Sequence, residues 1–476
     1  MSKKIIVTVL VIAIIAFLAV CGVLRFMDVN LAAGLAFIVG GAYLLIPILI
    51  RNPEFGITLM AFFLPFERIP SFEVGNFSIK INYVLIFVVG IIYLTVRMAK
   101  NQIRIPKDPT RFLVSLFIVI AALSMTQAIN LGRASEVFAL LALMGLLYLL
   151  VTISVNEERE FIAISKGIFW GALIAGIFGL WQFFGDAIGL PNAITLLKIG
   201  YDKSTFGFAR IQSTSIEPLY FANYLFIPIA LTVVMLLNGT MNRIVNWKIA
   251  YLALAIFAVN FVLTVSRGAY IGMIAMIVAL LIFQVKLIFR IKTILALLLV
   301  FIAVFGGAFL ALYKNESRAL DEFIAHVAVE DRTEGESVVS RLNAAEQAIE
   351  LYKNHPVLGI GIGNFGPNVQ FDPSETPDEG WFIVNDEYLE ILAEMGMVGL
   401  IVFALIILSL YIRAFIALAG SKNSFMRIFL SSMLIALLGI LVQYATFSTI
   451  YIFHIWFTIA LVSAATIKLL DYEKTR

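Results

Sequence analysis

The chain has 476 residues, of which 61% are hydrophobic and only 14% are charged, and its mean hydropathy is +0.99. A soluble globular protein is about 45–50% apolar and about 25% charged. The composition therefore excludes a soluble enzyme, a disordered chain and a coiled coil, and the net charge of +3 adds little to this. The apolar residues form long blocks without period-2 alternation, which also excludes an outer-membrane barrel. We expect an all-α polytopic integral membrane protein.

A helix needs about 20 apolar residues to cross the hydrocarbon layer, and fourteen segments qualify. The segment 54–69 is the weakest, because it is short and holds Pro65, Glu67 and Arg68. It can be a half-span or re-entrant segment, and losing it and one neighbour would leave twelve spans. We expect residues 5–24 to be an uncleaved first span. The predicted spans are 5–24, 30–50, 54–69, 77–98, 111–130, 133–154, 161–184, 218–238, 247–265, 268–286, 291–313, 386–413, 425–447 and 450–470.

The positive charges favour one orientation of these spans. Lys and Arg concentrate in short cytoplasmic loops. With the N-terminus in the cytoplasm, the short loops divide 21 to 8 in favour of that side, and five further basic residues lie in one long external loop. The flipped orientation reverses this ratio. We therefore predict that both termini are cytoplasmic and that residues 185–217 and 314–385 lie outside.

The stretch 314–385 is the only long non-membrane segment, with 13 acidic and 5 basic residues. Within it, residues 340–353 have apolar residues at helical spacing and predict a short surface helix. Residues 371–380 (FDPSETPDEG) predict turns and coil. Residues 361–366 (GIGNFG) match the G-x-G-x-x-G string, but no βαβ unit can surround them here. We therefore predict tight turns there and no dinucleotide site.

For several glycines and two histidines we predict structural roles rather than chemical ones. In the span 161–184, four glycines at short spacings predict close helix packing. We interpret His355, before a proline, as a turn residue, and His454, among aromatic residues, as part of an interfacial aromatic belt. The single Cys21 excludes a multi-Cys zinc site. We expect neither a metal nor a cofactor.

Two arginines lie where charge is costly. An arginine at the centre of a membrane helix costs roughly 2.5–3.5 kcal/mol. Arg267 lies between two apolar spans with almost no loop, and Arg210 lies shortly before a span, near Glu217. The guanidinium fork suits phosphate oxygens, so two arginines at one depth could hold a diphosphate. Two interpretations stay open, because each arginine could instead snorkel or pair locally, as Arg210 could with Glu217.

Four sequence features now occur in a characteristic order. In this order they resemble the bacterial O-antigen ligase and O-antigen polymerase superfamily, and the resemblance covers roughly residues 200–450. Members are multi-span membrane glycosyltransferases with a long periplasmic loop late in the chain. The features are STSIEP (213–218), TVSRGAYIG (264–272), NHPVLGIGIGNF (354–365) and NDEYLEILAEMGMVGL (385–400).

The resemblance implies an activity. The family transfers a glycan from a polyprenyl diphosphate carrier, such as undecaprenyl diphosphate, to an acceptor outside the membrane. It implies that Arg210 and Arg267 contact the diphosphate, and that an inverting displacement at the anomeric carbon proceeds without a metal. The expected partners are the carrier-linked glycan donor, a glycan or lipid acceptor and the bilayer, with no nucleic acid. The expected location is the bacterial plasma (inner) membrane.

One departure from the family affects the chemistry. Family ligases commonly have His-Asn-x-Tyr-Leu, and this chain has Asn385 at the histidine position, which cannot accept a proton. Either Asp386 or Glu387 serves as the general base, or no strong base is needed. Alternatively, both acids only cap the start of the helix. Residues that could shape the site are Glu217, Asn385, Tyr388 and His355.

We divide the chain into N-terminal membrane helices (1–200), a ligase-like region (201–450) and a last helix with a cytoplasmic tail (451–476). We predict a membrane glycosyltransferase of cell-surface polysaccharide assembly. Ligase, polymerase and an inactive relative all stay open. A transporter or flippase for polysaccharide or lipid-linked oligosaccharide is the alternative, although the sequence has no convincing repeat and its polar residues gather on one outer face. A purely structural membrane partner is a third possibility.

Overall fold

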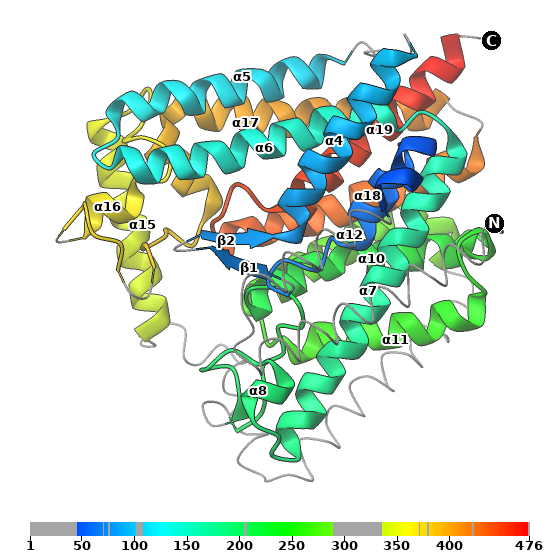
Figure 1. Cartoon of the computed structure of the whole chain (residues 1–476), viewed down its shortest axis with the longest axis horizontal. Coiled ribbons are helices and arrows are strands. Elements are labelled where there is room, and N and C mark those ends of the chain that lie inside the picture. The colour runs from blue at the N-terminus through cyan, green and yellow to red at the C-terminus, as the bar shows by residue number, and fades with distance from the viewer. Residues whose placement is uncertain are drawn as a thin grey trace.

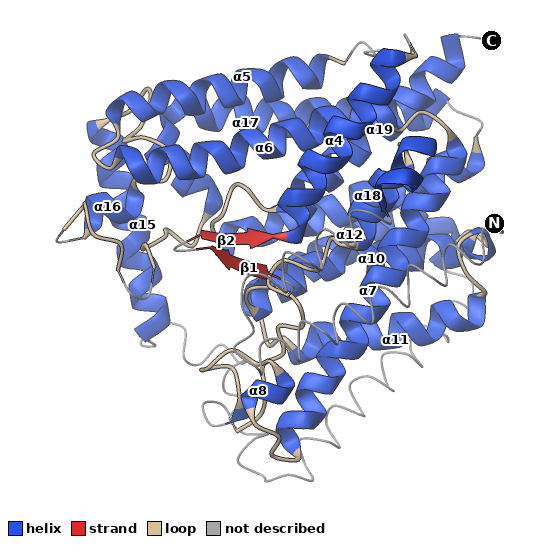
Figure 2. Ribbon diagram, in the orientation of Figure 1, coloured by secondary structure: helices blue, strands red, loops and turns tan. Residues whose placement is uncertain are grey.

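The computed structural model describes residues 45–69, 71–74, 77–100, 108–203, 207–288, 336–370, 372–377, 380–420 and 423–474. The predicted spans 5–24 and 291–313, and most of 30–50, lie outside these residues. The described part is built from helices, with one small two-stranded sheet (Figure 2).

Nine helices of the described residues are long and apolar enough to cross a membrane, and each coincides with a predicted span. A tenth apolar helix, α11 (Trp247–Leu263), is shorter and also falls on a predicted span. The prediction of an all-α polytopic membrane protein is confirmed. The nine helices are α4 (Ile81–Ala99), α5 (Pro109–Ser124), α6 (Leu131–Ser154), α7 (Glu158–Ala187), α10 (Pro218–Leu237), α12 (Arg267–Ile288), α17 (Glu387–Gly420), α18 (Ser424–Gln443) and α19 (Phe453–Lys474).

The weak span 54–69 forms only the eight-residue helix α3 (Phe55–Phe62), which is too short to cross a bilayer. Residues 63–69 carry the chain on to the hairpin without a helix, so the predicted segment is helical over only half of its length. After it come β1 (Ser71–Val74) and β2 (Phe77–Lys80), paired antiparallel with Ser71 opposite Lys80. The sequence analysis missed this hairpin, because four apolar-rich strand residues next to a membrane span look like its first turn.

The centre of the bundle is formed by α10, α18 and α19. Of the most apolar stretch of each helix, 83% is buried in α10, 83% in α18 and 89% in α19. On α5, which lies beside α17 in Figure 1, Phe112, Val119 and Leu123 remain exposed. Apolar side chains exposed on outer helices are what a lipid-facing surface requires.

Helix α7 packs closely on its neighbours through glycines. A Cβ atom at Gly171 would lie 2.1 Å from the carbonyl oxygen of Phe62 in α3, and one at Gly179 would lie 2.1 Å from Oδ1 of Asn260 in α11. The prediction that these glycines serve helix packing is therefore confirmed.

The connections of the described helices gather at two ends of the bundle. At the first, the backbone N–H of Arg68 donates to the Thr214 carbonyl (2.8 Å), which ties the segment before β1 to the loop before α10. The Asn130 N–H donates to Oδ1 of Asn364 (2.8 Å), which ties the α5–α6 connection to the segment before α17. We call this end, which carries β1 and β2, the hairpin end.

The opposite end is held by ion pairs. Arg413 near the end of α17 binds Asp108 before α5, and Arg243 before α11 lies 2.6 Å from a carboxylate oxygen of Glu158 at the start of α7. Successive connections thus alternate between the two ends, as the predicted topology requires. Which end faces the cytoplasm stays a prediction.

The predicted surface helix of the long loop is α15 (Glu336–Asn354), which packs on α17. The short helices α8 (Asn192–Thr195) and α16 (Phe365–Val369) also lie outside the bundle (Figure 1). Helix α17 is kinked at Gly396 (φ 66°), where a Cβ atom would lie 2.2 Å from the Val357 carbonyl oxygen. The kink separates a first helical piece, residues 387–395, from the rest of α17.

Candidate functional site

The two predicted arginines lie together at the hairpin end. The Arg210 guanidinium donates from Nη2 to the Val265 carbonyl (3.1 Å) and from Nε to the Thr264 carbonyl (3.4 Å), in the turn that precedes Arg267. Burial lowers the pKa of Arg210, and the like charge of Arg267 lowers it further against the opposing effect of Tyr201. The two guanidinium charges are therefore close enough to interact.

A third arginine, which the sequence analysis missed, joins them. Arg341 lies near the start of α15 in the long loop. Partial desolvation by the neighbouring protein, and then the like charge of Arg267, lower the pKa of Arg341, whose side chain keeps an exposed surface. Three arginines from three separate segments thus share one neighbourhood. In the sequence, Arg341 is only one basic residue in an acidic loop. That pattern does not predict where the helix that carries Arg341 packs.

Glu217 immediately precedes α10, and its carboxylate lies 4.0 Å from Nζ of Lys198. It also hydrogen-bonds Tyr201; burial first, and then the charge of Glu217, raise the pKa of Tyr201 to about 12. The Arg210 guanidinium lies over the ring of the same tyrosine, 5.8 Å from its centroid. Glu217 therefore helps to hold the loop that carries Arg210.

Strained backbone accompanies the predicted site residues. Val265 (φ 47°) lies two residues before Arg267, and Asn385 (φ 61°) lies two residues before Glu387. Ser213 (φ 51°), in the STSIEP segment, is a third residue in the left-handed region. Such conformations cost about 1–3 kcal/mol each in non-glycine residues and cluster at functional sites. A β-branched valine there is a clear outlier.

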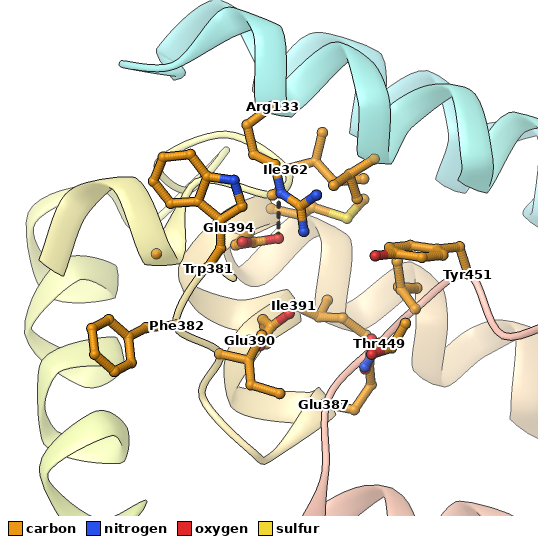
Figure 3. A pocket seen from close by; sticks show the side chains of 16 residues that line it. Arg133, Ile362, Trp381, Phe382, Glu387, Glu390, Ile391, Glu394, Thr449 and Tyr451 are labelled. Atoms are coloured by element: carbon orange, nitrogen blue, oxygen red, sulfur yellow. Dashed lines mark hydrogen bonds between the residues drawn. The ribbon is translucent and has the colours of Figure 1, made fainter. Parts of the chain in front are cut away.

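An acidic cavity opens beside the first piece of α17 (Figure 3). About 520 Å³ of space lies between its lining residues, with the open solvent at its mouth included. Glu387, Glu390 and Glu394 line it, facing Arg133 of α6 and Tyr451. Three acids on one helix face are spaced three and four residues apart, so they approach one another. Within the described ranges, no three His, Cys, Asp or Glu side chains are grouped so that they could hold a metal ion.

The glycine string 361–366 wraps one of these acids. The Gly363 N–H (2.7 Å) and the Phe365 N–H (3.0 Å) both donate to the carboxylate of Glu394. Gly361 (φ 99°) and Gly363 (φ 71°) adopt left-handed conformations that form the turn. The prediction of tight turns is confirmed.

The structure separates the two predicted catalytic acids. Oδ1 of Asp386 accepts hydrogen bonds from the backbone N–H groups of Tyr388 (3.0 Å) and Leu389 (3.1 Å), so Asp386 caps α17. Glu387 is only 1% exposed and lines the acidic cavity, where its Oε2 accepts from the Thr449 N–H at 2.6 Å. Of the two acids, Asp386 performs the capping role that was the alternative, and Glu387 has a place in a cavity.

Three further predicted residues have local roles. The Tyr388 hydroxyl donates to the Leu441 carbonyl of α18 (2.6 Å), and the Asn385 amide donates to the Ile383 carbonyl (3.4 Å). His355 is exposed just after α15, and its carbonyl accepts from the Gly359 N–H (3.1 Å), so it is the predicted turn residue.

The prediction for His454 is wrong. Its side chain is fully buried, with Nδ1 3.1 Å from Oε1 of Glu67 and Nε2 2.9 Å from Oδ1 of Asn223. The polar partners come from two distant segments of the chain and satisfy the ring inside the bundle. A sequence window around His454 contains only its aromatic neighbours, which favoured the interfacial interpretation.

A family model described as O-antigen ligase matches residues 252–404. The resemblance to the O-antigen ligase and polymerase superfamily is confirmed. The match covers about a third of the chain and contains Arg267, Arg341 and the three glutamates of the acidic cavity, whereas Arg210 lies before it. A comparison with curated proteins found no match. The family indicates a glycosyltransferase-type activity in polysaccharide assembly for this multi-pass membrane protein, with lipid-linked glycans as the substrate class.

Proposed function

We propose that this protein transfers a glycan from a polyprenyl diphosphate carrier to a glycan or lipid acceptor at the outer face of the bacterial plasma membrane. The observation that carries the proposal is the gathering of Arg210, Arg267 and Arg341 at the hairpin end. Three like charges repel one another, so an anion bound among them gains from all three. A diphosphate at the membrane surface, with its polyprenyl tail in the bilayer, is an anion of the right kind.

The arginines act on the leaving group. In the transfer, an acceptor hydroxyl oxygen forms a bond to the anomeric carbon while the bond from that carbon to the phosphate oxygen breaks. The bonding electron pair leaves with the diphosphate, and the anomeric configuration inverts. Guanidinium groups already fixed by backbone carbonyls, as Arg210 is, stabilise this developing charge without reorganising.

The hydroxyl proton goes to a base, and we assign this role to Glu387. Its carboxylate is held by the Thr449 N–H and lines a cavity, whereas Asp386 is occupied at the helix start. The position takes over the function of the histidine that family ligases commonly carry two residues earlier. General-base assistance of this kind is typically worth about 10²–10⁴-fold in rate.

Deleting the gene and separating the cell-surface glycans on a gel tests this function. A polymerase predicts that the ladder collapses to one repeat. A ligase predicts that the capped acceptor disappears while carrier-linked polymer accumulates. Unchanged surface glycans, with unchanged carrier-linked pools, would contradict the proposal. Accumulation of carrier-linked glycan on the cytoplasmic face alone would indicate the flippase instead.

A further inference from the structure

A second cavity adjoins the acidic cavity at the hairpin end. About 540 Å³ of space lies between its lining residues, with the open solvent at its mouth included. Thr449 and Tyr451 line both cavities. The remaining lining residues lie around the hairpin, at the start of α10 and at the start of α19: Glu67, Lys80, Asn82, Tyr83, Ile216, Tyr220, Ile452 and Phe453.

Two buried oxygen atoms in this lining have no hydrogen-bond partner. They are Oε2 of Glu67, a residue 5% exposed, and Oδ1 of Asn82, a residue 1% exposed. The amide of Asn82 donates from Nδ2 to the Phe66 carbonyl (3.3 Å), which leaves Oδ1 as a pure acceptor. A buried acceptor without a donor costs about 1–3 kcal/mol. Both atoms therefore suit donors supplied by a ligand.

A chain of hydrogen bonds fixes the proton on one nitrogen of His454. Nε2 of Gln443 donates to the Leu219 carbonyl (3.2 Å), so Oε1 of Gln443 is the acceptor for Nδ2 of Asn223 (3.0 Å). Oδ1 of Asn223 must then accept, and its partner is Nε2 of His454 at 2.9 Å. His454 therefore carries a proton on Nε2.

The other ring nitrogen of His454, Nδ1, contacts the carboxyl group of Glu67. Nδ1 of His454 lies 3.1 Å from Oε1 of Glu67, and a hydrogen bond there needs one more proton. The pair is either a carboxylic acid with a neutral imidazole or a carboxylate with an imidazolium, and its total charge is zero in both cases. Oε1 is engaged in either state. The support of Oε1 reaches back through His454 and Asn223 to α10, and Oε2 of this lining residue is left without a partner.

The rest of the lining suits a ring that carries hydroxyl groups. Tyr83, Tyr220 and Tyr451 provide aromatic surface for the C–H face of such a ring. Lys80 provides a donor, with Nζ 5.5 Å from the Tyr83 ring centroid. Burial lowers the pKa of Lys80, against the opposing charge of Glu67. A phosphate suits this cavity poorly, because its oxygens would lie against two unpartnered acceptors, the Glu67 carboxyl oxygen and the Asn82 amide oxygen.

We propose that this cavity is a sugar subsite, in which Glu67 and Asn82 accept hydrogen bonds from hydroxyl groups of a glycan while the tyrosines contact its ring. The inference rests on the proposed function, and it assigns binding residues that lie outside the family match at 252–404. The sugar is either the first unit of the carrier-linked donor or the accepting unit of the acceptor. Both sources present the same hydroxyl chemistry.

The test measures binding to the full-length protein in nanodiscs with three probes. These are bare undecaprenyl diphosphate, the carrier-linked repeat unit extracted from the deletion strain, and the free oligosaccharide released from it by mild acid. The variants are Glu67→Leu, which removes the acceptor oxygen, and Tyr83→Leu, which removes ring surface at a partly exposed position. Glu54→Leu is the matched control, because Glu54 precedes the same helix α3 at the opposite end and pairs with Arg97.

For a donor subsite, wild type and Glu54→Leu bind the carrier-linked unit more tightly than the bare carrier. Glu67→Leu and Tyr83→Leu reduce this gain about tenfold with unchanged affinity for the bare carrier. For an acceptor subsite, only the binding of the free oligosaccharide weakens in these two variants. If Glu67→Leu does not fold, Tyr83→Leu decides. A wild type that binds the bare carrier but gains nothing from any sugar, or variants that bind sugar normally, overturn the subsite alone. A wild type that binds neither carrier nor glycan overturns the proposed function as well.

Discussion

The two ends of the bundle differ in how their charged side chains are paired. At the end opposite the hairpin, charges of opposite sign form ion pairs. Asp108 accepts from Arg413, from the Tyr148 hydroxyl (2.6 Å) and from the Ser463 hydroxyl (2.9 Å), so both of its oxygens are satisfied. Arg97 and Glu54 form another ion pair there. Such networks tie helices together, and breaking a buried pair is costly.

At the hairpin end, charges of the same sign meet. Three arginines share one neighbourhood, three glutamates of α17 share a cavity, and Glu67 has an oxygen without a partner. None of this favours folding. Because the fold tolerates crowded like charges and unpartnered oxygens at the hairpin end but satisfies buried charge at the other end, we propose that ligands bind at the hairpin end.

The largest expected effect concerns which end faces outside. In a Cys21→Ser background, a cysteine at Thr376, exposed in the long loop, should react with an impermeant reagent in intact cells. A cysteine at Lys100, exposed at the opposite end after α4, should react only after permeabilisation. The basis is the 21-to-8 division of basic residues in short loops. The reverse labelling pattern would place the whole candidate site in the cytoplasm and rule out transfer at the outer face.

The next largest effect distinguishes Glu387, the first residue of α17, from Asp386, which precedes it. Glu387→Gln removes the proposed base and should lower the transfer rate by about 10²–10⁴-fold in purified membranes. Asp386→Asn should stay within a few-fold, because an amide oxygen can still cap the helix.

The opposite ranking of these variants would return the base to Asp386. Equal, small effects of both would mean that the reaction needs no strong base. Asn385→His then becomes informative, since histidine tolerates the left-handed conformation at that position comparatively well. A histidine that rescues Glu387→Gln would locate the proton acceptor two residues earlier.

Arg267→Lys keeps the charge but loses the guanidinium fork, and we expect the transfer rate to fall by about 10²–10³-fold, as for the loss of one donor to a developing anion. Arg243→Lys is the control, because Arg243 pairs with Glu158 at the opposite end. Protein levels in the membrane should be equal for both variants. Full activity of Arg267→Lys would mean that Arg267 only snorkels to the membrane surface.

Local signals in the sequence predicted the membrane helices, the helix in the long loop and the glycine turns. Arg267 stood out because charge between two spans is expensive. The features that were missed depend on segments far apart in the chain. His454 meets Glu67 across 387 positions, and its aromatic neighbours in sequence pointed to the wrong environment. Arg341 belongs to the site only because α15 docks on α17.

The smallest expected effect tests the opposite end itself. Asp108→Asn keeps one acceptor oxygen, replaces the other with an NH2 group and removes the charge that faces Arg413, and hydrogen bonds to charged groups contribute about 1.5–3 kcal/mol. We expect the free energy of unfolding in mild denaturant to fall by about that amount, while the transfer rate per folded molecule stays at the wild-type value. Tyr83→Leu should do the reverse, because Tyr83 is partly exposed and its ring lines the proposed sugar subsite. If Asp108→Asn lowered the transfer rate without destabilising the protein, the two ends would be coupled through the bundle, and charge pairing could not be used to tell the structural end from the functional one.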